Sequence, residues 1–159
     1  MTDSNTARQT FSMIDVGDKE VTLRRAFAQG TIRMSSAAFT AIRERSNPKG
    51  DVLAIAEVAA IQGAKRTAEL LPLCHPLPLD AVRVRFDLDE ANSSVTVHCE
   101  ARTSAKTGVE MEALCGVNAG LLCIYDLSKA VDPVLTISDV RLNRKEGGKS
   151  GVWNHPEAE

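Results

Sequence analysis

The stretch AVRVRFDLDEANSSVTVHCEAR, residues 81–102, decides the fold class. In each half of it, apolar residues alternate with polar or charged ones, which is the period of a strand with one buried and one solvated face. The polar pair Asn92-Ser93 between the halves is typical of a turn. The stretch therefore predicts an antiparallel β-hairpin.

The chain immediately before the hairpin is rich in proline. The segment LPLCHPLPL, residues 71–79, contains three prolines. Proline removes a backbone donor and disfavours helix in the residue before it, so this segment predicts a stiff, apolar connection. Upstream of it, residues 51–70 carry apolar side chains near helical spacing, with Asp51 as a candidate N-cap. They predict a helix that ends where the prolines begin.

The first third of the chain predicts a strand and a short helix. Residues 21–34 form an extended apolar pattern interrupted at Gly30, which indicates one long or bulged strand. Ser35 or Ser36 can cap a helix that continues through Arg45. The sequence Asn-Pro-Lys-Gly at residues 47–50 then predicts a turn.

The segment after the hairpin predicts a buried helix over residues 109–131. Its stretch 113–125 has no charged residue and is apolar nearly all round. Such a helix must be buried on more than one side, and we expect a sheet on one side and another subunit on the other. It is too short to cross a bilayer, which needs about 20 apolar residues. A last strand over residues 134–142 completes an α+β fold, an antiparallel sheet covered by helices.

Composition limits the classes of function. The 159 residues suit one domain, and we expect residues 1–12 and 152–159 to be flexible. The net charge of -2 lacks the basic footprint of a general nucleic-acid binder. The polar N-terminus predicts neither a signal peptide nor a membrane anchor, which favours the cytoplasm. The four cysteines lack zinc-site spacing, so we expect reduced core thiols and no metal site: Cys74, Cys99, Cys115 and Cys123.

Two segments carry lysines and an aspartate suited to proton transfer. Lys49 precedes a predicted helix N-terminus, where free amides attract anions and the dipole can lower the pKa of a lysine. A solvated turn lysine is the alternative. Asp126 and Lys129 lie three residues apart and share one helix face. They are either a surface ion pair or an acid–base pair tuned by partial burial.

A histidine and two carboxylates are candidates for ligand binding. His75 lies between prolines, so its ring position is restricted, although an isolated histidine is more often structural. Glu110 and Glu112 lie at the start of the buried helix. They could compensate the helix dipole or bind the donor groups of a purine-like base.

The C-terminal segment KEGGKSG, residues 145–151, resembles a phosphate loop superficially. The glycine that such a loop needs at its start is replaced by Asn143, and no helix is predicted to follow, so this interpretation fails. The two lysines, Lys145 and Lys149, could still close over an anion, or the segment could be a frayed tail. Arg24 adds positive charge from the first predicted strand.

Five ordered motifs together resemble one known family. They are Lys49-Gly50-Asp51, residues 71–77 (LPLCHPL), residues 106–114 (KTGVEMEAL), Ile124-Tyr125-Asp126 with Lys129-Ala130-Val131, and residues 147–151 (GGKSG). The chain resembles the cyclic pyranopterin monophosphate synthases, the family of molybdenum cofactor biosynthesis protein C, from about Met13 to Gly151. The resemblance implies a ferredoxin-like fold and a homohexamer, a trimer of dimers, with each active site between two subunits.

The resemblance also implies a reaction and residue roles. The expected enzyme is a lyase that converts (8S)-3',8-cyclo-7,8-dihydroguanosine 5'-triphosphate to cyclic pyranopterin monophosphate and diphosphate. The roles implied are catalysis by Lys49, Asp126 and Lys129; substrate binding by Leu73, Cys74, His75, Glu110, Met111 and Glu112; and triphosphate binding by Arg24, Lys145 and Lys149. The sequence shows no required cofactor, and Mg²⁺ can accompany the triphosphate. The alternative is a non-enzymatic ferredoxin-like module that binds a nucleotide or pterin and regulates a partner.

Overall fold

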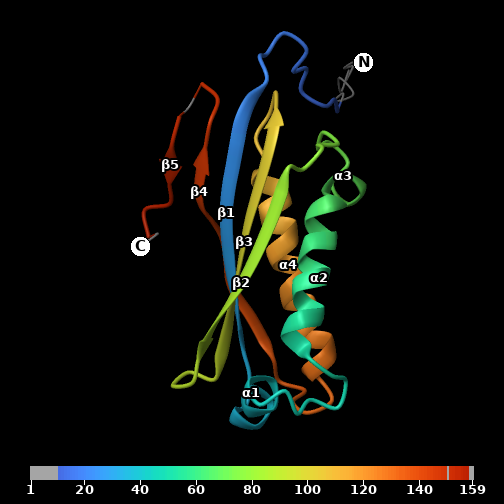
Figure 1. Ribbon diagram of the computed structural model, residues 1–159, viewed down its shortest axis with the longest axis vertical. Coiled ribbons are helices and arrows are strands. Elements are labelled where there is room, and N and C mark those ends of the chain that lie inside the picture. The colour runs from blue at the N-terminus through green and yellow to red at the C-terminus, as the bar shows by residue number, and fades with distance from the viewer. Residues whose placement is uncertain (1–10, 150, 158–159) are drawn as a thin grey trace, which may run out of the picture.

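The computed structural model describes residues 11–149 and 151–157 (Figure 1). Its elements are β1 (Thr22–Arg33), α1 (Ser36–Arg43), α2 (Val52–Lys65), α3 (Thr67–Leu70), β2 (Ala81–Asp89), β3 (Ser94–Ala105), α4 (Glu110–Ser128), β4 (Thr136–Glu146) and β5 (Trp153–Asn154). The expected flexibility of residues 1–10 and 158–159 lies outside the described residues.

The strands form one antiparallel sheet in the order β2-β3-β1-β4-β5. The α+β fold is thus confirmed, with the ferredoxin-like arrangement in which the first and third long strands lie side by side. The predicted hairpin is β2 and β3, with Val82 opposite Ala101 and Phe86 opposite Val97. Of the two alternatives for the first strand, long or bulged, the structure shows the long one, because β1 pairs with β3 in continuous register. The register of β1 against β4 shifts between Phe27 and Ala28 and between Gln29 and Thr31, but the extra residue at each shift lies in β4.

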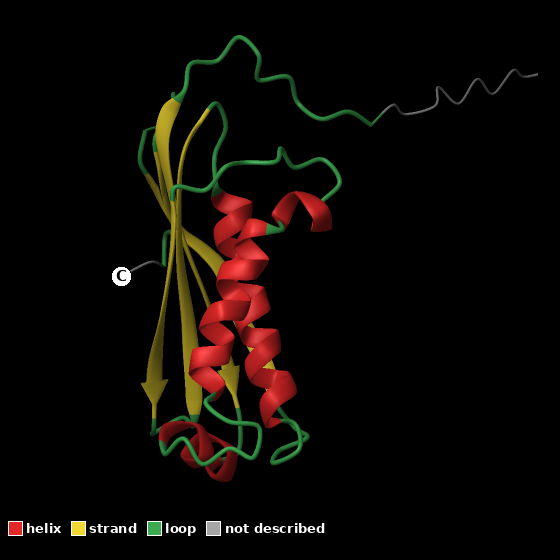
Figure 2. Cartoon of the chain, turned by 45° about the vertical axis from the view of Figure 1, so that its right-hand side comes forward, coloured by secondary structure: helices red, strands yellow, loops and turns green. Residues whose placement is uncertain are grey.

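The two long helices cover one face of the sheet and leave the other face open (Figure 2). Along β3, residues Val95, Val97 and Cys99 are at most 1% exposed and belong to the same core as Val117 and Leu121 of α4. Burying a side chain of this size contributes about 1.5–3 kcal/mol. The hydrophobic effect therefore fixes α4 against the centre of the sheet and determines where each end of that helix lies.

Several element boundaries differ from the prediction. The first helix ends at Arg43 rather than Arg45, whose φ of 55° is not helical. The helix expected over residues 51–70 breaks at Arg66 into α2 and α3, where the Thr67 hydroxyl donates to the carbonyl of Ala64 at 3.0 Å. The helix predicted at 109–131 spans Glu110–Ser128, and the last long strand continues to Glu146 rather than Leu142. The sequence did not predict β5, whose two residues are too few to show a period.

The cysteines and the apolar helix only partly match their predictions. All four cysteines are free, but Cys99 is buried whereas Cys74, Cys115 and Cys123 are half-buried. Burial raises the pKa of Cys99 to about 12, which makes it inert. In α4, Leu122 is 62% exposed in the single chain. Burial of that side by another subunit therefore stays a prediction.

Candidate functional site

Lys49, Asp126 and Lys129 meet at the end of α4 that lies beside α1 in Figure 1. Lys129 Nζ lies 2.7 Å from Asp126 Oδ1, and Lys49 Nζ lies 3.3 Å from Asp126 Oδ2. Lys49 Nζ also donates to the main-chain carbonyl of Asp126 at 3.1 Å. That carbonyl is among the last of α4, where the helix dipole favours a cation. One carboxylate thus lies between two ammonium groups.

Local sequence explains how Lys49 reaches this position. The Asn47 carbonyl accepts from the Gly50 N–H at 2.9 Å, which closes the predicted turn, and Gly50 has a φ of 101° that favours glycine. The buried Asn47 side chain accepts from the Lys49 N–H at 2.9 Å. The backbone of Lys49 is therefore fixed, and its long side chain crosses to α4.

The electrostatics of this cluster favour the ionised forms. The hydrogen bond from Lys129, and next the one from Lys49, lowers the pKa of Asp126. The hydrogen bond between Lys129 and Asp126 also raises the pKa of Lys129. In the single chain, the side chains of Lys49, Asp126 and Lys129 remain 42%, 57% and 56% exposed. Water therefore screens these charges, and in one chain alone these three side chains do not form a buried acid–base pair.

A second group of predicted residues lines a cavity of about 240 Å³ at the other end of α4. Apart from the three basic residues predicted to bind the triphosphate, the group contains every residue predicted to bind the substrate: Leu73, Cys74, His75, Glu110, Met111 and Glu112. The proline-rich connection supplies the first three, and the first turn of α4 supplies the others. The structure therefore brings together segments that are more than 30 residues apart in the sequence.

The two carboxyl groups of this cavity differ in environment. Glu112 is 4% exposed, and desolvation raises its pKa, so burial favours the protonated acid. Glu110 Oε1 accepts from Lys145 Nζ at 3.0 Å. No side chain caps the N-terminus of α4, so a carboxylate there is also favoured by the helix dipole. Lys145 is thereby held at the edge of the cavity.

Arg24 and the glycine pair of the C-terminal segment lie against each other. A Cβ atom on Gly148 would lie 1.9 Å from Arg24 Nη1, and one on Gly147 would lie 2.1 Å from the Leu23 carbonyl. Both glycines have positive φ, so side chains are excluded by contact and by conformation. Lys149 is exposed and follows directly. The predicted basic residues therefore share the end of the molecule that holds the cavity.

The lysine–aspartate cluster and the cavity are far apart in one chain. Residues 110 and 126 lie 16 positions apart on the straight helix α4, which corresponds to ~24 Å at 1.5 Å per residue. A small substrate cannot touch both ends of the same helix. If both groups act on one substrate, they must come from different chains.

The structure adds residues that the sequence did not single out. Ile14, Val16 and Lys19, upstream of β1, line the same cavity. Their local sequence has no feature that indicates a site.

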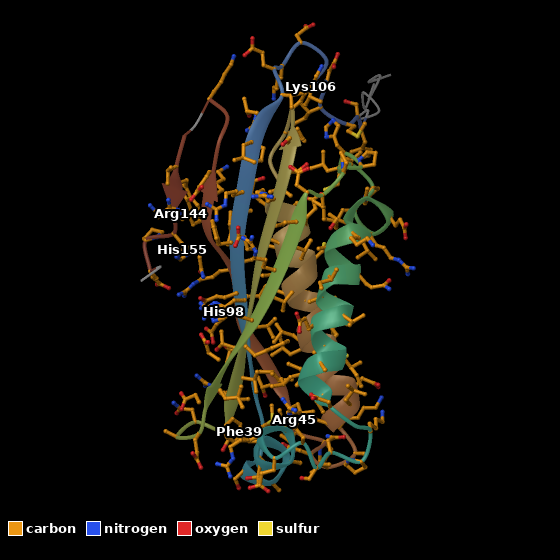
Figure 3. The ribbon with its side chains drawn as sticks, viewed as in Figure 1. Phe39, Arg45, His98, Lys106, Arg144 and His155 are labelled. Atoms are coloured by element: carbon orange, nitrogen blue, oxygen red, sulfur yellow. The ribbon has the colours of Figure 1, made fainter. Side chains whose placement is uncertain are left out.

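A larger cavity, of about 710 Å³, lies on the open face of the sheet beside His98 and Arg144 (Figure 3). Burial, followed by the charge of Arg85, lowers the pKa of His98.

Within residues 11–149 and 151–157, no three or more His, Cys, Asp or Glu side chains are grouped so as to hold a metal ion. None of the helices found in these ranges has the length and apolar character needed to cross a membrane.

Comparison with known proteins assigns a family to most of the chain. A family model described as the MoaC family matches residues 13–148. The matched region contains every element from β1 to β4 and both groups of predicted residues, Lys149 excepted.

Proposed function

The chain belongs to the MoaC family of molybdenum cofactor biosynthesis enzymes, and we propose that it is a lyase with one specific substrate. That substrate is (8S)-3',8-cyclo-7,8-dihydroguanosine 5'-triphosphate, and the products are cyclic pyranopterin monophosphate and diphosphate. The observation that carries the proposal is that Asp126 contacts both its helix neighbour Lys129 and Lys49, which lies 77 residues earlier in the sequence.

The lysine–aspartate cluster supplies the proton transfers that the rearrangement needs. A ring bond of the cyclised nucleotide opens, the pterin ring is rebuilt, and a sugar hydroxyl then attacks the innermost phosphate and expels diphosphate. Asp126 and Lys129 exchange protons with the rearranging ring, while Lys49 assists proton transfer and neutralises developing charge. In the free chain the pKa of Asp126 is lowered and that of Lys129 is raised, so these two groups are a carboxylate and an ammonium ion. Burial by substrate and a second subunit would bring their proton affinities closer together.

The cavity end of the molecule binds the substrate. The purine-derived ring offers N–H donors to the carboxyl groups of Glu110 and Glu112 and to His75, beside Leu73, Cys74 and Met111. Arg24, Lys145 and Lys149 bind the triphosphate. Any Mg²⁺ would arrive on the phosphate oxygens rather than in a protein cage.

The distance along α4 supports a site shared by two subunits. We propose that the cluster of one chain faces the cavity of another, within a homohexamer built as a trimer of dimers. The exposed Leu122 and Met111 on α4 are consistent with a further contact on that helix. The proposed location is the cytoplasm.

Supplying the cyclic triphosphate to the purified protein tests the reaction. Formation of the pterin product and release of diphosphate are followed together. Turnover by the wild-type chain and its loss in Lys49→Ala and Lys129→Ala support the proposal. Tight binding of the triphosphate by the wild type without any turnover would instead favour the alternative, a non-enzymatic module that binds a nucleotide or pterin.

A further inference from the structure

Residues 11–21 form a strap that leads into β1 and passes beside the cavity of the predicted substrate site. Three of its side chains, Ile14, Val16 and Lys19, line the cavity with His75. The strap is poorly anchored by apolar contacts, since Phe11 and Ile14 are 80% and 74% exposed. Its conformation within the chain therefore depends on polar contacts.

Two side-chain hydrogen bonds link the strap to the rest of the described chain. His75 Nε2 lies 2.9 Å from the Ile14 carbonyl oxygen. Lys106 Nζ donates to the Gly17 carbonyl oxygen at 2.5 Å. Within the strap, Gly17 N–H donates to Asp15 Oδ1 at 2.8 Å, which keeps the segment folded between the two anchors.

The bond to Ile14 determines the chemistry of His75. A carbonyl oxygen has no proton to give, so the bond requires a proton on Nε2. In the neutral imidazole ring, Nδ1 is then the acceptor. Without the strap, either ring nitrogen could carry the proton, and the ring could rotate. The main-chain oxygen of Ile14 thus fixes both the orientation and the tautomer of His75.

Lys106 holds the strap through its hydrogen bond to Gly17. It follows the end of β3 and lies at the end of the molecule where the strap meets β1 (Figure 3). The next two residues, Thr107 and Gly108, line the cavity themselves. Lys106 therefore couples the wall of the cavity to the strap that orients His75.

We propose that the strap is a positioning element of the substrate site. Lys106 holds it through Gly17, and the Ile14 carbonyl holds His75 as a hydrogen-bond acceptor at Nδ1 for an N–H of the substrate's base ring. This inference rests on the proposed function for the identity of the substrate. The hydrogen bonds within the free chain do not depend on that identity.

The tautomer of His75 in the free protein tests the positioning role directly. We record nitrogen–proton correlation spectra of protein with labelled histidine rings under mildly alkaline conditions, with His75→Gln to assign the signal. His98 on β3 and His155 after β5 do not line the cavity and serve as internal references (Figure 3). Wild type should show His75 with its proton on Nε2, and Lys106→Met should show a mixture of tautomers. Identical His75 signals in the two proteins would overturn the positioning role.

Kinetics with the cyclic triphosphate test the consequence for substrate binding. If Lys106→Met leaves the strap docked in about a fifth of molecules, KM rises about fivefold, while kcat changes by less than about twofold. Lys106→Arg keeps a cationic donor and should restore KM, and Lys65→Met on α2 is the matched control. An unchanged KM in Lys106→Met would overturn the link to substrate. Absence of turnover in the wild type would count against the proposed function alone, because the histidine spectra need no substrate.

Discussion

The carboxylate of Asp126 has ammonium partners at 2.7 and 3.3 Å, yet all three side chains are largely exposed. Exposed ion pairs contribute little to folding, since water screens the charges and ordering two long side chains costs entropy. The cluster therefore adds little to the stability of a single chain. Changes within it should affect chemistry much more than folding.

Replacing Asp126 by asparagine separates these two effects. Asp126→Asn keeps the shape of the side chain but removes its charge and its capacity to accept a proton, so turnover should fall at least ~100-fold. The melting temperature should stay close to that of the wild type. Asp139→Asn is the control, because Asp139 is exposed and bonds its neighbour Ser138. Near-normal turnover by Asp126→Asn would remove Asp126 from the mechanism.

Glu112 predicts a pH dependence of stability with a definite sign. Its folded-state pKa is raised by desolvation above the ordinary value of 4.5, so the native state binds the proton more tightly than the unfolded state. The contribution of this tighter proton binding to the free energy of unfolding is complete at pH values below 4.5 and is lost as pH rises through the folded-state pKa. The side chain in Glu112→Gln is neutral at every pH. The free energy of unfolding of this variant should therefore rise relative to that of the wild type as pH rises from about 4.5.

Urea midpoints measured across this pH range check the Glu112 prediction. Glu57→Gln on the exposed side of α2 is the control and should follow the wild type at every pH. A difference between Glu112→Gln and the wild type that does not change with pH would contradict the predicted linkage.

Local sequence left Lys49 ambiguous, and the structure shows why. A lysine before a helix is commonly solvated, and the sequence around Lys49 does not point to a partner as distant as Asp126. Its contact is with Asp126, which only the packing of the α2 and α4 segments brings near. The motifs, taken together, identified both residues through the family resemblance. Spacing alone could not, because it does not report contacts between distant segments.

Among the elements, long periodic segments were predicted well and short ones were not. The hairpin of β2 and β3 has nine and twelve residues, enough for the alternation to show. By contrast, α3 has four residues and β5 has two, and their conformations depend on tertiary contacts. For β5, the contact is pairing of Trp153 with Lys145 and of Asn154 with Arg144.

The close approach of α2 and α4 predicts a cost for one added methyl group. A Cβ atom on Gly63 would lie 2.4 Å from the Ala119 side chain and 2.9 Å from the Cys115 carbonyl. Alanine is the better helix former by ~1 kcal/mol, but overpacking costs ~1–3 kcal/mol and meets a rigid backbone here. Gly63→Ala should therefore lower the free energy of unfolding.

Urea denaturation measures the effect of Gly63→Ala. Gln62→Ala, at an exposed position next along the same helix, is the control and should change little. A more stable Gly63→Ala protein would show that helix propensity dominates and that the two helices can separate at little cost.

At the scale of the whole molecule, the length of α4 separates the two halves of the predicted site by ~24 Å. The sequence motifs indicated which residues belong to the site, but not that α4 places them at opposite ends of the fold. That separation is a property of the straight helix. If two chains share the site, as we propose, this separation has a consequence that a site within one chain would not have.

Two inactive variants should restore activity to each other. Asp126→Asn disables the cluster end, and His75→Ala disables the cavity end, at opposite ends of α4. If each site takes one end from each of two chains, random co-assembly of equal amounts makes about a quarter of the sites intact. The co-assembled mixture should therefore show about a quarter of wild-type turnover. Each variant alone, and a mixture of separately assembled proteins, should show almost none. If the site lay within one chain, every chain in the mixture would still carry one defect, and co-assembly would restore nothing.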